Sequence, residues 1–153
     1  MKAADFTYTL TTDKTPEEVF QAITQVRTWW FGLYDEVIKG GTEKLNDEFS
    51  FRAGDGVHYS KHKLVEVIPN QKIVWLVTDS DFNFVKKNDE WTGTKVIFDI
   101  SQKDGKTQLT FTHEGLTPEI ECYNACAPAW TQYLQEKLLP LINTGKKQSG
   151  TNH

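Results

Sequence analysis

The sequence predicts an α+β fold, in which a curved antiparallel sheet of six strands is covered on one side by helices. Three observations lead to this prediction. Six segments have the residue patterns of strands, and one segment near each end of the chain has apolar residues at helical spacing. Their order is strand, helix, five strands, helix. Because each helix has one apolar face and the sheet needs cover on one side, we expect two layers around one core.

The first strand and the first helix are expected near the N-terminus. Residues 6–10 alternate large apolar side chains with threonine, which is typical of a strand with one buried face. Thr15 stands before a proline and two glutamates, so it can cap a helix in which Glu18 completes a capping box. The helix should end near Thr28, and residues 32–47 are expected to be irregular because two adjacent glycines interrupt them.

Three strands are expected in the middle of the chain, at residues 49–52, 58–67 and 72–78. Glycine and proline turns separate them. The last of the three is apolar at almost every position, which favours an interior strand that is at least partly covered on both faces.

The strand at residues 58–67 carries two histidines whose direction can be inferred. The lysines within it favour the solvent face, so Ser60, His62 and Leu64 are expected to point inward. The valines that follow fit the opposite phase, which indicates a β-bulge. His58 and His62 would lie roughly 13 Å apart on one face of a regular strand, which is too far for a shared metal ion.

The clearest turn signal lies within residues 94–116. Asp104 and Gly105 suit a two-residue primed turn, and such a turn fixes the register of the strands on either side. In that register the pairs on the buried face are Ile100 with Leu109, Phe98 with Phe111, and Val96 with His113. His113 is therefore a polar side chain at the end of an apolar row.

The C-terminal helix is expected to begin after Thr117, which is followed by a proline in a second helix-start pattern. Its apolar residues recur at steps of three and four as far as Leu141. Pro128 lies inside this pattern and should kink or split the helix. We expect residues 1–144 to form a single domain and residues 145–153 to form a disordered polar tail.

Composition excludes several classes of function. Seventeen basic and 21 acidic residues give a net charge of −4 without a basic cluster, which argues against a nucleic-acid partner. No apolar run approaches the roughly 20 residues of a membrane span, and the N-terminus lacks the apolar core of a signal peptide. The two cysteines do not make a disulfide framework. These features predict a cytoplasmic protein without cofactor or metal.

Four sequence segments are similar to a known family. They are TPEEVFQAIT with the following WW, EWTGTKVIFDI, THEGL, and AWTQYL with TGK. Together they resemble the START-like (SRPBCC) superfamily with its helix-grip fold, and within it the group related to the C-terminal domain of the activator of heat-shock protein 90 ATPase. The resemblance implies a cavity between the sheet and the last helix, usually for a hydrophobic small molecule. It implies no single activity.

Aromatic residues make up 12% of the chain, and such rings can fill a core or line a pocket. With the resemblance, a pocket is the stronger expectation. The predicted ligand-binding residues are Trp30, Phe51, His62, Trp75, Phe98, Phe111, His113, Tyr123, Trp130 and Tyr133.

Three functions remain open from the sequence. The first is binding of a small hydrophobic or aromatic molecule without catalysis, with His113, His62 or Tyr133 orienting a polar end. The second is a cyclase or dehydratase that uses His113 as acid or base, although a structural role for His113 is the stronger expectation. The third is a cochaperone-like module that binds a chaperone or another protein partner.

Overall fold

The computed structural model of this chain describes residues 5–30, 36–53, 58–82, 91–117 and 123–144. The expected tail at residues 145–153 lies outside the described residues. None of the helices in the described part of the chain is long and apolar enough to cross a membrane.

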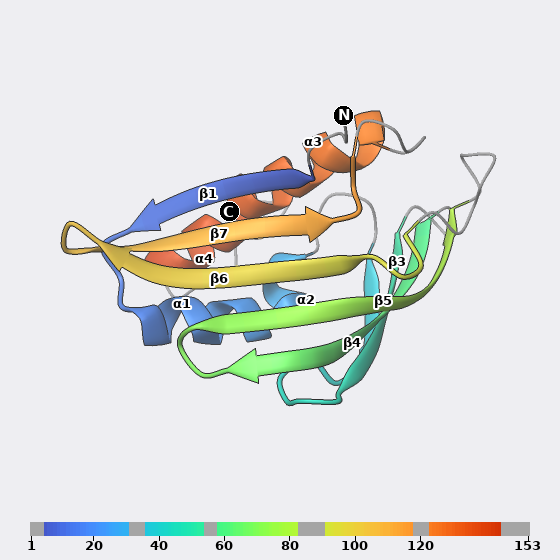
Figure 1. Cartoon of the computed structure of the whole chain (residues 1–153), viewed down its shortest axis with the longest axis horizontal. Coiled ribbons are helices and arrows are strands. Elements are labelled where there is room, and N and C mark those ends of the chain that lie inside the picture. The colour runs from blue at the N-terminus through green and yellow to red at the C-terminus, as the bar shows by residue number, and fades with distance from the viewer. Residues whose placement is uncertain (1–4, 31–35, 54–57, 83–90, 118–122, 145–153) are drawn as a thin grey trace, which may run out of the picture.

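One antiparallel sheet of seven strands, in the order β1-β7-β6-β5-β4-β3-β2, forms the first layer. Its strands are β1 (Phe6–Thr12), β2 (Val37–Gly40), β3 (Glu48–Ala53), β4 (His58–Ile68), β5 (Lys72–Phe82), β6 (Lys95–Lys103) and β7 (Lys106–Glu114). The helices form the second layer, behind β1, β7 and β6 in the view of Figure 1. The predicted α+β helix-grip architecture is confirmed.

The expected number of six strands is wrong by one. Strand β2 lies in the stretch that was expected to be irregular, and it pairs with β3 so that Ile38 is opposite Phe51 and Gly40 opposite Phe49. Gly40 has a φ of 109°, and a Cβ placed on it would lie 2.2 Å from the carbonyl oxygen of Glu48. Only glycine permits this close approach. Gly40, one of the two glycines expected to interrupt regular structure, is instead the last residue of β2.

The hairpin of β6 and β7 has the predicted register. Lys103 is opposite Lys106, and the three buried pairs are those expected, including Val96 with His113. Asp104 and Gly105 both have positive φ, 53° and 79°, as a type I′ turn requires. The predicted bulge in β4 is also confirmed, as an irregularity in the pairing of β4 with β5 between Leu64 and Glu66.

The N-terminal helical region consists of two helices, α1 (Pro16–Thr24) and α2 (Val26–Trp29). The predicted capping box is confirmed, because the Glu18 amide donates to Thr15 Oγ1 and the Thr15 amide donates to Glu18 Oε1, both at 3.1 Å. The second helix directly precedes Trp30, so it brings two adjacent tryptophans to the sheet.

The C-terminal helical region consists of α3 (Tyr123–Tyr133), a π-helical turn η1 (Leu134–Leu138) and α4 (Leu139–Thr144). The helix is not split at Pro128, since α3 continues through this exposed residue. The irregularity lies before Pro140 instead, where the Leu139 amide donates to the Leu134 carbonyl. Pro140 lacks an N–H and its ring would clash with the carbonyl four residues earlier, so we attribute the wider turn to it.

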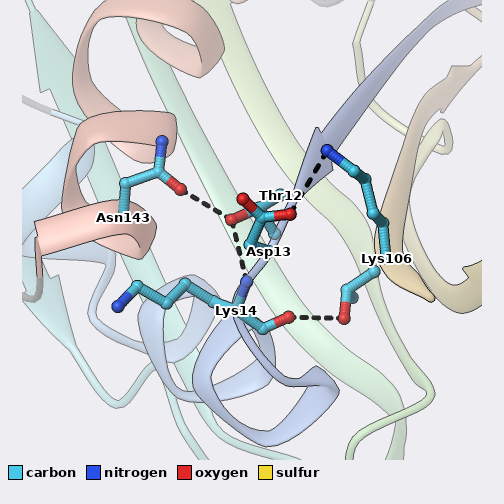
Figure 2. A network of polar contacts seen from close by, with 6 residues as sticks. Thr12, Asp13, Lys14, Lys106 and Asn143 are labelled. Carbon is cyan, nitrogen blue, oxygen red and sulfur yellow. Dashed lines mark hydrogen bonds and ion pairs between the residues drawn. The ribbon is translucent and has the colours of Figure 1, made fainter.

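A polar network fastens α4 to the ends of β1 and β7 (Figure 2). The Thr12 hydroxyl donates to Asn143 Oδ1 at 2.6 Å and accepts from the Lys14 amide at 3.2 Å. The Thr107 hydroxyl donates to the Lys14 carbonyl at 2.5 Å. Thr12 and Thr107 are buried, so these hydrogen bonds fix one end of the helix on the sheet.

Replacing Thr12 with valine should lower the free energy of unfolding by about 1–2 kcal/mol, because Asn143 Oδ1 and the Lys14 amide each lose a hydrogen-bond partner. Urea unfolding followed by circular dichroism measures the change. Thr9→Val, on the exposed face of the same strand, is the matched control and should stay within about 0.5 kcal/mol of the unmodified chain. Equal effects of the two substitutions would contradict the role given to the Thr12 hydroxyl.

Candidate functional site

Nine of the ten residues predicted to bind a ligand lie buried in one ring-rich region between the sheet and the helices. Each has at most 3% of its surface exposed: Trp30, Phe51, His62, Trp75, Phe98, Phe111, His113, Trp130 and Tyr133. The tenth, Tyr123, is half-buried at the start of α3 and packs against this region. Alternation along the strands brings these side chains to one face of the sheet, and the helices add the rest.

Trp30 is the hub of this region. Its ring stacks on Phe51 with the centroids 3.7 Å apart and on Trp130 with the centroids 4.8 Å apart. It also contacts Trp75 at 5.8 Å and Tyr133 at 6.3 Å. Trp30, which directly follows the short helix α2, therefore contacts both the sheet and the C-terminal helix.

All five tryptophans of the chain belong to this one network. Trp29 stacks on Trp30 and on Trp75, at 6.2 and 6.3 Å. Trp91 stacks on Trp130 with the centroids 5.8 Å apart and the planes 9° from parallel. Because Trp30 also stacks on Trp130, the five tryptophans form one connected set of ring contacts.

Trp91 is surrounded by three histidines, which we call the histidine cluster. The centroid of His113 lies 4.6 Å from that of Trp91, His58 lies at 4.9 Å and His62 at 6.5 Å. The predicted site contained neither Trp91 nor His58. His58 could have been found from the sequence, because it shares one strand face with Ser60 and His62, which were expected to point inward. Trp91 could not, because it lies in the turn before β6, where no periodic pattern indicates the direction of a side chain.

Hydrogen bonds hold His113 in one tautomer. The indole N–H of Trp130 donates to His113 Nδ1 at 3.1 Å, and an indole can only donate, so Nδ1 is the acceptor. The proton of the neutral ring is therefore on Nε2, 2.8 Å from Thr94 Oγ1. Thr94 accepts it, and its own hydroxyl donates to the Trp91 carbonyl at 2.6 Å. Both nitrogens of His113 are thus engaged.

A glycine is required beside this chain of hydrogen bonds. Gly115 has a φ of 101°, and a Cβ placed on it would lie 2.6 Å from Cγ2 of Thr94. The strand end that carries His113 can therefore approach Thr94 only when residue 115 has no side chain.

His62 is bonded on one side only. Its Nε2 lies 2.9 Å from Ser60 Oγ, and its ring stacks on Phe49. Within the described part of the chain, His62 Nδ1 has no hydrogen-bond partner, and neither has Trp75 Nε1. Both atoms are buried, and the two rings are in contact with their centroids 5.4 Å apart.

Burial keeps the three histidines neutral. Loss of hydration lowers the pKa of His58 and that of His113 to about 3, from an ordinary value of 6.5. Burial also lowers the pKa of His62 well below that value, and neighbouring histidines add to the effect. At neutral pH the site therefore presents uncharged hydrogen-bonding groups among aromatic rings.

The burial and hydrogen bonds of His113 argue against the acid–base role that the sequence left open. His113 has a hydroxyl partner, but it is fully buried and its lone pair and proton are both in use, which is the arrangement of a structural residue. Among the described residues, no group of three or more histidine, cysteine, aspartate or glutamate side chains is placed to hold a metal ion. Cys126 is a buried cysteine, and Cys122 lies outside the described residues.

Tyr133 also has a defined partner. Its hydroxyl donates to Glu36 Oε2, which ties the end of α3 to the segment before β2. A separate hollow of about 390 Å³ lies at the network of Figure 2 and is lined by Thr11, Thr12, Asp13, Lys14, Lys106 and Asn143. Asp13 and Lys106 pair there at 3.2 Å, so much of its polar lining is already satisfied internally.

Comparisons with known proteins agree with this fold. The sequence profile of the family described as "Activator of Hsp90 ATPase homolog 1-like protein" matches residues 13–142. No protein with a curated description matches the chain at a significant level.

Several solved structures have the same fold. The solution structure of the Aha1 dimer from Colwellia psychrerythraea has a TM-score of 0.71 and 21% identity, over 94% of this chain and 98% of that one. Mll3558 protein from Rhizobium loti has a TM-score of 0.69 and 15% identity, over 92% and 97%. Protein Ms6760 from Mycobacterium smegmatis has a TM-score of 0.64 and 10% identity, over 94% and 97%.

The histidine cluster should make the chain sensitive to mild acid. Below pH 6.5 these histidines bind protons in the unfolded chain but stay neutral in the folded chain. The free energy of unfolding therefore falls as the pH falls toward 3. Each histidine contributes a slope of up to about 1.4 kcal/mol per pH unit, and above pH 6.5 the contribution vanishes.

Urea unfolding at several pH values between 7.5 and 5 measures this slope. His58→Phe removes one titrating ring, so near pH 5 the slope should fall by about 1.4 kcal/mol per pH unit, equivalent to one proton. An unchanged slope in this variant would show that His58 is not held neutral in the folded protein.

Proposed function

The chain belongs to the family of Activator of Hsp90 ATPase homolog 1-like proteins, within the START-like superfamily, and from this we propose that it binds a small hydrophobic or aromatic molecule between the sheet and the C-terminal helix. No catalysis is required in this proposal. Binding sites for such molecules are lined mainly by apolar and aromatic side chains with a few placed polar groups.

One observation carries the proposal. The ring region combines extensive aromatic surface with three buried histidines that stay neutral. Such surroundings suit an uncharged aromatic guest, which gains burial without losing the hydration of a charge. The engaged nitrogens of His113 support binding over acid–base chemistry.

The π-helical turn gives further support. Its residues Leu134 and Leu138 are buried on the side of the rings, and Tyr133 directly precedes it. Single π turns recur at functional sites because they interrupt the regular ladder of helical hydrogen bonds and shift the side chains on one face. The helix over the rings is therefore less regular there than elsewhere along its length.

A second candidate, a protein-interaction module, is favoured by one observation at the sheet surface. Leu45 and Val65 are exposed at 53% and 37%. They lie beside the hydrogen bonds in which Leu64 pairs with Asn46 and Asp47, so two exposed apolar side chains flank one backbone contact. Apolar surface of this kind can contribute to a protein interface.

The proposed function predicts selective binding of an uncharged aromatic probe. Naphthalene should raise the melting temperature in a concentration-dependent way, since a ligand of the folded state stabilises it. Naphthalene-2-sulfonate should not, because its charge would be buried among neutral groups at a cost of several kcal/mol. Equal shifts with both probes, or none with naphthalene, would contradict the proposal.

The interaction module predicts that an Hsp90-type chaperone is retained by the immobilised chain. The double substitution Leu45→Lys and Val65→Lys should abolish retention, because it places two charges on the apolar surface. The same variant should bind naphthalene as the unmodified chain does, which separates the two candidates. Retention that survives both substitutions would exclude this surface.

A further inference from the structure

Two neighbouring buried nitrogens of the ring region have no hydrogen-bond partner among the residues that the structure describes, and we infer that they hold an uncharged oxygen of the bound molecule. They are Trp75 Nε1 and His62 Nδ1, on side chains that are 1% and 0% exposed. The inference rests on the proposed function and adds the chemical class of the ligand: an aromatic or aliphatic compound with a carbonyl or hydroxyl group.

Folded proteins rarely leave such atoms unpaired. A buried donor or acceptor without a partner costs about 1–3 kcal/mol, and in native structures it is usually served by a water molecule or a ligand. Two other indoles of the same region show the usual pattern, since Trp29 Nε1 donates to the Ile23 carbonyl and Trp130 Nε1 to His113 Nδ1, both at 3.1 Å. Two unpaired nitrogens on neighbouring rings therefore point to a group that belongs between them.

The sheet register brings the two rings together. Trp75 on β5 is opposite Leu64 on β4, and His62 is two residues from Leu64 on the same inward face. Both rings contact Phe49, with centroid distances of 4.9 Å for His62 and 5.0 Å for Trp75. Both also contact Trp30, at 5.4 and 5.8 Å. The two side chains that carry the unpaired nitrogens thus share two aromatic neighbours.

The chemistry of the two nitrogens defines the group they bind. An indole N–H only donates, so the atom facing Trp75 must be an acceptor. When Ser60 donates to His62 Nε2, the proton is on Nδ1, and a carbonyl oxygen can accept from both rings. In the other tautomer Nδ1 is an acceptor, and a hydroxyl group can accept from Trp75 and donate to His62.

Charged groups fit this position poorly. An ammonium ion has no lone pair, so it cannot accept a hydrogen bond from the Trp75 N–H. A carboxylate would be buried beside histidines that are neutral, without a positive charge from the cluster. The class is therefore an uncharged ketone, ester, amide, alcohol or phenol attached to an apolar body.

The test compares two probes of nearly equal shape, 2-acetylnaphthalene and 2-ethylnaphthalene, which differ mainly in the carbonyl oxygen. Isothermal titration should show about tenfold tighter binding of the ketone to the unmodified chain, equivalent to one hydrogen bond. Trp75→Phe keeps an aromatic ring and removes one of the two groups that can donate to the oxygen, so the preference should shrink while the hydrocarbon still binds. Trp29→Phe is the matched control and should keep the preference, because its N–H is bonded within the protein.

A second measurement reports directly on the donor. In ¹⁵N-labelled protein, adding the ketone should shift the indole N–H signal of Trp75 downfield and leave that of Trp29 in place. This readout does not depend on the stability of any variant. A crystal structure with the ketone present and only a water molecule on Trp75 Nε1 would overturn the inference.

The outcomes separate the inference from the function on which it rests. Binding of both probes with equal affinity, unchanged by Trp75→Phe, would overturn the oxygen site and leave the hydrophobic binding function intact. Failure of both probes to bind the unmodified chain would overturn the binding function itself.

Discussion

The arrangement of the two layers depends on one buried hydrogen-bonded chain, from the Trp130 indole through His113 and Thr94 to the Trp91 carbonyl. It joins the C-terminal helix to β7 and to the turn before β6, and every donor in it has an acceptor. Polar groups in a core specify a single arrangement when all are satisfied, because any shift of the helix would leave one of them unpaired. The aromatic contacts bury apolar surface, while this chain of hydrogen bonds fixes where the rings meet.

Much of the fold follows from local patterns in the sequence. The turn at Asp104 and Gly105 sets the register of a hairpin, and period-two alternation then places His113 on the buried face. The capping box at Thr15 is equally local. Strand β2 could not be predicted this way, because four residues carry too little pattern and its partner β3 supplies the pairing.

The missing parts of the site have similar physical causes. The wide turn before Pro140 depends on how far the helix continues past Pro128, which a residue pattern does not determine. Trp91 occupies the centre of the histidine cluster from a turn, where no periodicity indicates direction. Alternation along β4 gave the inward direction of His62, but its unpaired nitrogen depends on the neighbours that tertiary packing provides.

The contact network of all five tryptophans has an optical consequence. Trp29, Trp30 and Trp75 lie within 15–18° of parallel to one another, and Trp91 and Trp130 within 9°. Transition dipoles at these separations couple, so the spectrum of the chain depends on how the rings lie relative to one another. Its near-ultraviolet circular dichroism and fluorescence therefore record the geometry of the whole aromatic region, and a disturbance at any one indole changes the spectrum of the set.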